Sequence, residues 1–350
     1  MILLIEKLSN AMGAPGFEDE VVGIIKDELA GDFHLEEDKM RNLVIKRKNH
    51  DGNKPVVMLD GHSDEVAFMV QHLLPNGQLK FLPLGGWVPA NVAASKVWVR
   101  TEEGQYIPGL VGSTPPHFLK NKSAEASLDD MHIDVGATSL DELINVFKID
   151  VGAPVVPHAV FDSNDLGIMM GKAFDNRLGC GCVIETLRAL EGLDLPVDVV
   201  GVISTQEEIG TRGARVNATR VKPDVALVFE GTPADDTFRS PLEAQGKIRG
   251  GVQIRHLDRS MVASPRLVRL AKDTAKKYKI SFQQAVRAGG GTNAGSIHIE
   301  EEAVPSIVLG TPVRYAHTNY GISAIEDYQA TINLAVSMIK DLTPEDIANL

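Results

Sequence analysis

The strongest constraint on the fold is a set of near-continuous apolar runs, each followed by acidic or histidine side chains. The runs and the polar residues after them are 56–59 with His62 and Asp64, 197–204 with Glu207 and Glu208, and 225–229 with Glu230. Runs of this kind are typical of strands that are buried on both faces of a sheet. Because open α/β sheets bind ligands at the carboxyl ends of their strands, we expect these polar side chains to converge at one edge.

Two further residues fit the same pattern. Asp175 lies just ahead of an apolar helix, and His317 follows the last apolar run. Together with the strand-end residues they form a set of imidazoles and carboxylates. Such donors suit Zn²⁺, Co²⁺ or Mn²⁺, so the sequence predicts a metal site.

Each of these motifs also has a purely structural interpretation. The structural alternatives are a strand-end histidine satisfied by a nearby acid (His62 with Asp64), a solvated acidic turn (Glu207 and Glu208), a helix N-cap (Asp175), a polar strand end (Glu230) and a surface histidine (His317). For Asp175 the cap and the ligand are equally well supported by the local sequence. The joint pattern favours metal, because two imidazoles and several carboxylates fall at corresponding places.

The Glu207-Glu208 pair indicates how such a site could work. Adjacent carboxylates diverge, so one can ligate a metal while the other faces a bound water as general base. The loop Gly210-Thr211-Arg212-Gly213 that follows is tight enough to bring backbone close to a substrate. Two metals about 3.5–4 Å apart, sharing one carboxylate, would complete a hydrolytic centre.

The remaining sequence predicts an α/β fold with an insertion. Helical periodicity marks residues 5–12, 21–29, 178–190, 267–274 and 328–339, and strands are expected at 43–47, 55–60 and 306–309. Between residues 66 and 162 this periodicity gives way to short β-like pieces separated by Gly and Pro turns. We therefore expect an α/β domain formed by residues 1–66 and 164–350, and an inserted small all-β domain at residues 67–163.

The net charge and the cysteine content limit which binding partners and which cellular compartment we expect. The net charge is −12 with no basic cluster, so nucleic acid is not an expected partner. Cys180 and Cys182 are the only two cysteines and lie on different faces of a predicted helix, which favours a reducing cytoplasm. The N-terminus lacks the pattern of a signal peptide, and no apolar run approaches the ~20 residues of a membrane helix.

Taken together, the motifs resemble those of the M42 family of metallo-aminopeptidases. The matching segments are Pro15-Gly16-Phe17-Glu18, Gly61-His62-Ser63-Asp64-Glu65-Val66, residues 171–177 (GKAFDNR), Gln206-Glu207-Glu208-Ile209-Gly210 with Arg212-Gly213-Ala214, Gly290-Gly291-Thr292-Asn293-Ala294, and His317. The resemblance covers nearly the whole chain.

This resemblance implies a role for each site residue. The implied roles are one metal held by His62 and Glu230, a second held by Glu208 and His317, a bridge between them from Asp175, general-base catalysis by Glu207, and orientation of His62 by Asp64. It further implies two divalent ions in each subunit, Zn²⁺ or Co²⁺ and by chemistry also Mn²⁺, and short peptides as substrates.

The fold and assembly implied by the resemblance are equally specific. The expected fold is a zinc-peptidase-like mixed sheet flanked by helices, with a β-barrel-like inserted domain used in assembly, from dimers up to dodecamers. Residues 81–88, which include Gly85, Gly86 and Trp87, could form part of an assembly interface, but for any one of them a place in the core is the simpler interpretation. Two positions depart from the family pattern, because Glu230 and Asn293 stand where many relatives have Asp.

Substrate contacts are less sharply indicated. Gly291 and Thr292 are expected near the substrate, and Arg314 or Arg212 could form a basic first pocket for an acidic residue. Three other functions share the same residues: hydrolysis of N-acylated amino acids or peptides, a catalytically silent scaffold, and glycan hydrolysis. The histidines among the acids and the presence of only two tryptophans disfavour glycans.

Overall fold

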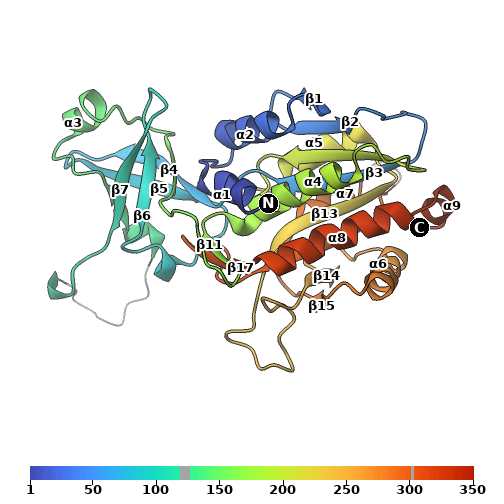
Figure 1. The fold of residues 1–350 in the computed structure, drawn as a ribbon. Helices are drawn as coiled ribbons and strands as arrows, with labels where there is room; N and C mark the ends of the chain where they lie inside the picture. The colour runs from blue at the N-terminus through green and yellow to red at the C-terminus, as the bar shows by residue number, and fades with distance from the viewer. Residues whose placement is uncertain (119–126, 301–302) are drawn as a thin grey trace.

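A mixed sheet of eight strands forms the centre of the larger domain (Figure 1), and the computed structural model describes residues 1–118, 127–300 and 303–350. The strand order is β1-β2-β12-β3-β13-β16-β14-β15. The strands are β1 (Phe33–Glu37), β2 (Leu43–Arg47), β3 (Val56–His62), β12 (Asp198–Ser204), β13 (Val225–Pro233), β14 (Val252–Leu257), β15 (Phe282–Val286) and β16 (Ser306–Val313).

The four central strands, β12, β3, β13 and β16, are parallel to one another. Ser204 lies opposite His62, and Glu230 lies opposite Gly310. Strands β12 and β16 are buried along their whole length, as their apolar sequences predict. Their shared direction places the carboxyl ends of all four at one edge, so this part of the fold prediction is confirmed.

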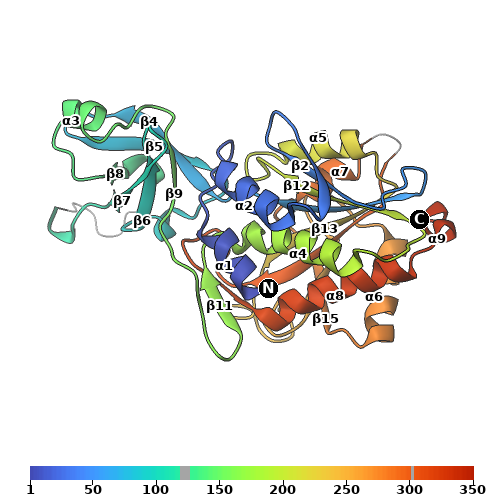
Figure 2. The ribbon, with the colours of Figure 1, turned by 45° about the horizontal axis from the view of Figure 1, so that its top comes forward.

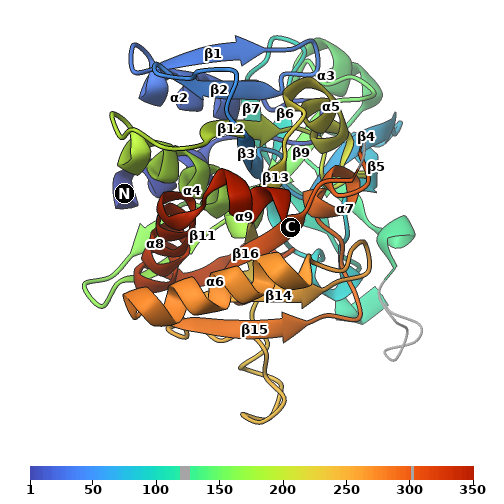
Figure 3. The same cartoon turned by 90° about the vertical axis from the view of Figure 1, so that its right-hand side faces the viewer.

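Helices cover both faces of this sheet, as the view along it shows (Figure 3). The α-helices of this domain are α1 (Ile2–Asn10), α2 (Asp19–Leu29), α4 (Phe174–Leu190), α5 (Arg212–Val221), α6 (Pro265–Tyr278), α7 (Asn293–Ile297), α8 (Ile325–Asp341) and α9 (Pro344–Ala348), while α3 (Leu140–Asn145) belongs to the inserted segment. The long helices α4 and α8 contact each other and the central strands, while α5 and α7 pack together against strands β3, β12, β13 and β16. Among the described residues, no helix has the length and apolar character needed to cross a membrane.

The inserted segment forms a closed six-stranded barrel beside the sheet domain (Figure 2). Its strands, in the order β4-β5-β8-β7-β6-β9, are β4 (Ala67–Leu73), β5 (Gln78–Leu84), β6 (Lys96–Arg100), β7 (Tyr106–Gly112), β8 (His132–Asp134) and β9 (Pro154–Pro157). The expected β domain is confirmed, and in addition to its strands it includes the short helix α3. This helix begins where the Ser139 hydroxyl accepts a hydrogen bond from the N–H of Glu142.

Strands β2 and β3 are close in sequence but do not pair. Strand β12 lies between them, antiparallel to β2 and parallel to β3. Asp198 at the start of β12 accepts hydrogen bonds from the N–H groups of Asp51 and Gly52, at 2.9 and 2.7 Å. The segment at residues 51–53 therefore docks onto a later strand instead of closing a hairpin between β2 and β3.

A small three-stranded sheet lies between the barrel and the sheet edge at which the strand-end residues gather. It contains β10 (Asp162–Ser163), β11 (Ile168–Gly171) and β17 (Gly321–Ala324), and Gly171 lies opposite Gly321. Because β11 runs into the start of α4 and β17 follows the loop of His317, this sheet brings those two segments side by side.

Candidate metal centre

His62 is the innermost of the predicted ligands. It ends strand β3, and its ring is only 1% exposed. Its Nδ1 lies 3.2 Å from the carbonyl oxygen of Asp64 and 3.4 Å from the Asp64 carboxylate. Its Nε2 points the other way, toward Asp175 and Glu230 at 3.3 and 3.6 Å. One ring edge is therefore held by its own segment, while the other faces a set of carboxylates.

Asp175 lies between the two histidines. Its Oδ1 is 3.3 Å from Nε2 of His62, and its Oδ2 is 3.3 Å from Nε2 of His317. A carboxylate that offers one oxygen to each of two imidazoles has the arrangement needed to bridge two cations. The structure thus brings together the three groups on which the sequence hypothesis depended.

The surrounding acids complete two clusters. His62, Glu207 and Glu230 form one, and Asp175, Glu208 and His317 form the other, with the donor atoms within 4.8 Å of one another in each. Glu208 Oε1 lies 3.6 Å from Nε2 of His317, and Glu207 Oε2 lies 3.9 Å from Nε2 of His62. Glu207 is thus the acid farthest from its histidine.

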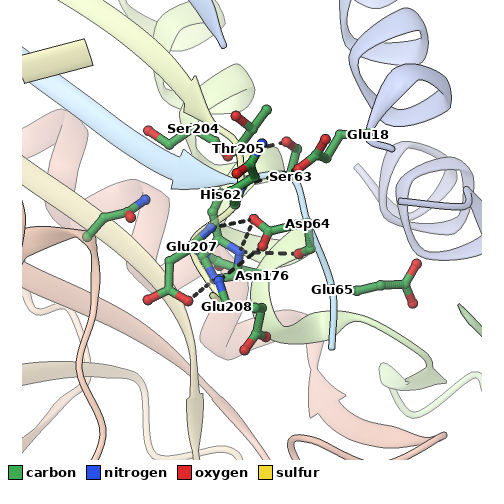
Figure 4. Close-up of polar contacts among 12 residues, drawn as sticks. Glu18, His62, Ser63, Asp64, Glu65, Asn176, Ser204, Thr205, Glu207 and Glu208 are labelled. Carbon is green, nitrogen blue, oxygen red and sulfur yellow. Dashed lines mark hydrogen bonds and ion pairs between the residues drawn. The ribbon is translucent and has the colours of Figure 1, made fainter. Parts of the chain in front are cut away.

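Two buried carboxylates hold the turn that carries Glu207 and Glu208 (Figure 4). The Asp64 carboxylate accepts the N–H of Glu207 at 2.9 Å and the N–H of Glu208 at 3.0 Å. Glu18 accepts the preceding N–H, that of Gln206, at 3.2 Å. Three consecutive backbone amides are therefore fixed by side chains from elsewhere in the chain, and the sequence offered no local signal for this role of Glu18.

The start of α4 shows that Asp175 does not cap the helix. Asp175 and Asn176 have non-helical backbone angles, so the Asp175 side chain turns toward the histidines instead of capping the helix. Asn176 serves the capping function, because its Oδ1 accepts the N–H of Gly179 at 3.0 Å. The same oxygen accepts the N–H of Gly231, and its Nδ2 donates to Phe229. This amide ties the Asp175 segment to strand β13 on both sides of Glu230.

The electrostatics of the centre call for added positive charge. Burial raises the pKa of Glu208 to about 8 and of Glu230 to about 7, and it raises that of Glu207 well above its ordinary value. Against the effect of burial, the Asp175 and Glu208 carboxylates raise the pKa of His317 to about 10. Positive charge on the protonated His317 imidazole therefore compensates the buried carboxylates, as divalent cations bound here would.

The residues present fit two divalent ions. Glu208 Oε1 and Glu230 Oε1 are buried without a hydrogen-bond partner among the described residues. Leaving buried carboxylate oxygens unpaired is costly unless a cation compensates them. Imidazole and carboxylate donors suit Zn²⁺, Co²⁺ and Mn²⁺.

A cavity of about 730 Å³ opens from the centre, and Gly291 and Thr292 line its wall as expected. The sequence analysis missed Arg255 and Arg287, which also line it. Arg255 donates to Asp258 and Thr232, and Arg287 donates to Asp235 and Pro233. Both arginines belong to the region of β14 and β15, two strands that were not predicted.

The arginines proposed for the first pocket lie elsewhere. Arg314 is not among the residues lining the cavity, and its guanidinium forms two hydrogen bonds with the Asp236 carboxylate, at 2.9 and 2.5 Å. Arg212 reaches Gln206 at 3.4 Å and does not line the cavity either. The positive charge of Arg314 is therefore already matched by an acid.

A buried ion cluster supports the segments on either side of the centre. Lys172 donates to Glu65 at 2.5 Å and to the Ala11 carbonyl at 2.7 Å. Arg177 donates to the same Glu65 oxygen at 3.1 Å and to the Leu8 carbonyl at 2.6 Å. Burial lowers the pKa of Lys172 to about 8. The cluster joins the end of α1 to the chain beside His62 and Asp175.

The chain is similar to known proteins over nearly its whole length. A family model described as M42 glutamyl aminopeptidase matches residues 42–334. The chain is 30% identical to the glutamyl aminopeptidase of Lactococcus lactis subsp. cremoris, over 99% of this chain and 98% of that protein. The similarity therefore includes both domains.

Solved structures agree over the same length. The structure of a TET aminopeptidase from the marine sediment archaeon Thaumarchaeota archaeon SCGC AB-539-E09 has a TM-score of 0.95 and 35% identity, covering 99% of both chains. The TET1 peptidase of Pyrococcus horikoshii, described as assembling into a tetrahedron or a large octahedral shell, has a TM-score of 0.88 and 25% identity, covering 97% of this chain and 99% of that one.

Proposed function

Because this chain belongs to the M42 family of aminopeptidases, we propose that it is a binuclear metal-dependent enzyme that releases N-terminal residues from short peptides. The observation that carries the proposal is the position of Asp175, which offers one oxygen to each histidine at 3.3 Å. A single metal or a purely structural ion pair would not need both histidines to face the same acid.

In this proposal each side chain has one task. His62 and Glu230 would hold one ion, Glu208 and His317 would hold the other, and Asp175 would offer one oxygen to each. Bound divalent ions would lower the pKa of a bound water and stabilise charge on the substrate carbonyl oxygen.

Glu207 acts as the general base. Its long distance from His62, 3.9 Å, leaves its carboxylate available to take a proton from water and to return it to the leaving amine. The hydrogen bond from the Glu207 N–H to Asp64 keeps this carboxylate beside the centre. Asp64 thereby acts on the base and on His62 at once.

The test combines metal analysis with a pair of substrates. The purified full chain is expected to bind two equivalents of Zn²⁺ or Co²⁺ and to cleave a free-amine tripeptide one residue at a time from its N-terminus. The N-acetylated form of the same peptide should not be cleaved. Preferred cleavage of the acetylated peptide would instead identify an enzyme for blocked substrates, and cleavage of neither peptide by the two-metal protein would contradict the proposal.

We also propose that copies of this chain assemble through the barrel. Leu82, Val88 and Leu110 are large apolar side chains of the barrel region that are 47%, 57% and 49% exposed. Exposed apolar side chains of this kind are typical of interfaces when they gather on one surface. Light scattering coupled to gel filtration should give a mass of at least a dimer, and a monomer at micromolar concentration would refute this part.

A further inference from the structure

We propose that the inserted barrel positions His317 and so sets the metal affinity of the cluster formed by Asp175, Glu208 and His317. The inference rests on the proposed binuclear function. The segment Gly85-Gly86-Trp87, which has no part in the proposed catalytic roles, would thereby act on the candidate metal centre. The first cluster, around His62, lacks this dependence.

The two histidines are oriented in different ways. His62 ends a buried strand, and its Nδ1 contacts Asp64, only two residues further along the chain. His317 lies on the loop between β16 and β17, is 37% exposed and has a positive φ of 59°. A loop residue with this exposure needs an external contact to keep its ring in one orientation.

That contact comes from the barrel. The Nδ1 of His317 lies 2.8 Å from the carbonyl oxygen of Gly86, which is 231 positions away in the sequence. A carbonyl oxygen can only accept, so Nδ1 carries a proton, and Nε2 is the nitrogen that can bind a cation once the cation displaces its proton. Nε2 is the atom that faces Asp175 and Glu208. A hydrogen bond of this kind at the second ring nitrogen is what fixes metal-binding histidines.

Gly85 brings the same segment against the other ligand. A Cβ added to Gly85 would lie 3.0 Å from Glu208 Oε2, 3.3 Å from Glu208 Cβ and 2.8 Å from a Val66 methyl group. Its φ of 89° also disfavours any side chain. The barrel backbone can therefore approach the second cluster only because this position is glycine.

Two further contacts hold the segment and the loop in place. The Trp87 indole donates to the Ala67 carbonyl at 3.1 Å, and its ring stacks on Phe68 with centroids 4.7 Å apart. Asn319, two residues after His317, donates to the carbonyl of Lys96 in the barrel at 3.2 Å. The loop of His317 is therefore tied to barrel backbone at two points.

The test is metal binding by Gly85→Ala, with Gly136→Ala as the matched control. Gly136 is also in the barrel domain and has a φ of 87°, but a Cβ there would meet no atom within 4 Å. Both variants carry similar backbone strain, and only Gly85→Ala intrudes on Glu208. Titration calorimetry with Zn²⁺ should show one of the two sites weakened about 10–100-fold in Gly85→Ala and both sites unchanged in Gly136→Ala.

His317→Ala identifies the affected site. In both Gly85→Ala and His317→Ala, the site that keeps its wild-type Zn²⁺ affinity should be the same one. In the double variant, that remaining affinity should be no lower than in His317→Ala alone. If Gly85→Ala does not fold, as judged by circular dichroism, Trp87→Phe keeps the stacked ring and removes only the N–H donor, and it should weaken the same site to a smaller extent. If Gly85→Ala, or Trp87→Phe in its place, folds and binds Zn²⁺ at both sites with wild-type affinity, the inference is overturned.

The same titration separates this inference from the proposed function. Wild-type protein that binds fewer than two ions contradicts the binuclear function itself. Wild-type protein that binds two ions, together with a folded Gly85→Ala variant that binds them equally well, contradicts only the role of the barrel.

Discussion

The side-chain amide of Asn293 donates a hydrogen bond of 2.7 Å to the Oδ2 of Asp60, and both residues are fully buried. Ser204 donates to the other oxygen of the same carboxylate at 2.5 Å. Asn293 is one of the two positions at which the resemblance described above led us to expect Asp. The contact explains how the amide is accommodated here: it is a donor to a buried acid at the end of β3.

Asn293→Asp should therefore destabilise the protein in a pH-dependent way. Burial already raises the pKa of Asp60 to about 6, and a second carboxyl beside it would compete for one proton. The loss in free energy of unfolding should be larger at pH 8 than at pH 5, because at pH 5 the two carboxyls can share a proton. Asn293→Ala is the control: it removes the donor without adding charge and should cost about 1–3 kcal/mol at both pH values.

Glu207→Gln should separate metal binding from turnover. The amide has the same shape but cannot accept a proton, so kcat should fall about 10²–10⁴-fold while two metal ions remain bound. Metal analysis and a peptide assay on the same sample measure both quantities. Activity within threefold of wild type would show that another group acts as base.

Asp64→Asn should weaken the centre without removing a predicted ligand. The Asp64 carboxylate accepts the N–H groups of both Glu207 and Glu208, and an amide can accept only one while presenting a donor to the other. We expect a loss of about 10–100-fold in metal affinity or kcat/KM. Glu18→Gln, which affects the N–H groups of Gly16 and Gln206 but not those of Glu207 and Glu208, should be milder; equal effects would contradict a special role for Asp64.

Metal binding should release protons. Although burial opposes it, the neighbouring carboxylates raise the pKa of His317 to about 10, so this imidazole is protonated at pH 7 until a cation displaces the proton. Titration calorimetry at pH 7 in buffers of different ionisation enthalpy should give a release of at least one proton for the two ions. Identical heats in all buffers would rule this out, and His317→Ala should reduce the number released.

The stability of the C-terminal region should depend on pH through Asp327. Burial raises the pKa of this carboxyl from 3.8 to about 6, although it accepts the N–H groups of Arg249 and Gly251. Because the folded state binds this proton more tightly than the unfolded state, stability present below about pH 4 is lost as the pH rises through 6. Asp327→Asn should thus gain stability relative to wild type between pH 4 and 7, measured by urea unfolding. A constant difference across that range would refute the assignment, and exposed Glu326→Gln serves as control.

Much of the sheet and of the centre could be predicted from local sequence. The uninterrupted apolar runs at β12 and β13 indicated strands buried on both faces, and the polar residues after them indicated the ligand-binding edge. Strand order was not accessible in the same way. That β12 separates β2 from β3 depends on pairing between distant segments, to which the Asp198 contacts with residues 51 and 52 contribute.

Where a residue suited two different roles, the local sequence could not choose between them, and the tertiary structure was needed. Asp175 was equally suited to cap a helix or to bind metal, and in the structure the neighbouring Asn176 forms the cap while Asp175 faces the two histidines. Arg314 had the right charge for a substrate pocket, but Asp236 neutralises it away from the cavity. Arg255 lines the cavity instead, on a strand whose sequence gave no clear period.

By itself, the amino-acid sequence determined which side chains could form a hydrolytic metal centre, because residue type and burial pattern are local properties of a strand and its end. Only the tertiary structure decided that the barrel reaches this centre through the carbonyl of Gly86. Backbone carbonyls are present at every residue and leave no mark in composition or periodicity. Their role depends on how two domains dock, and that follows from packing over the whole chain.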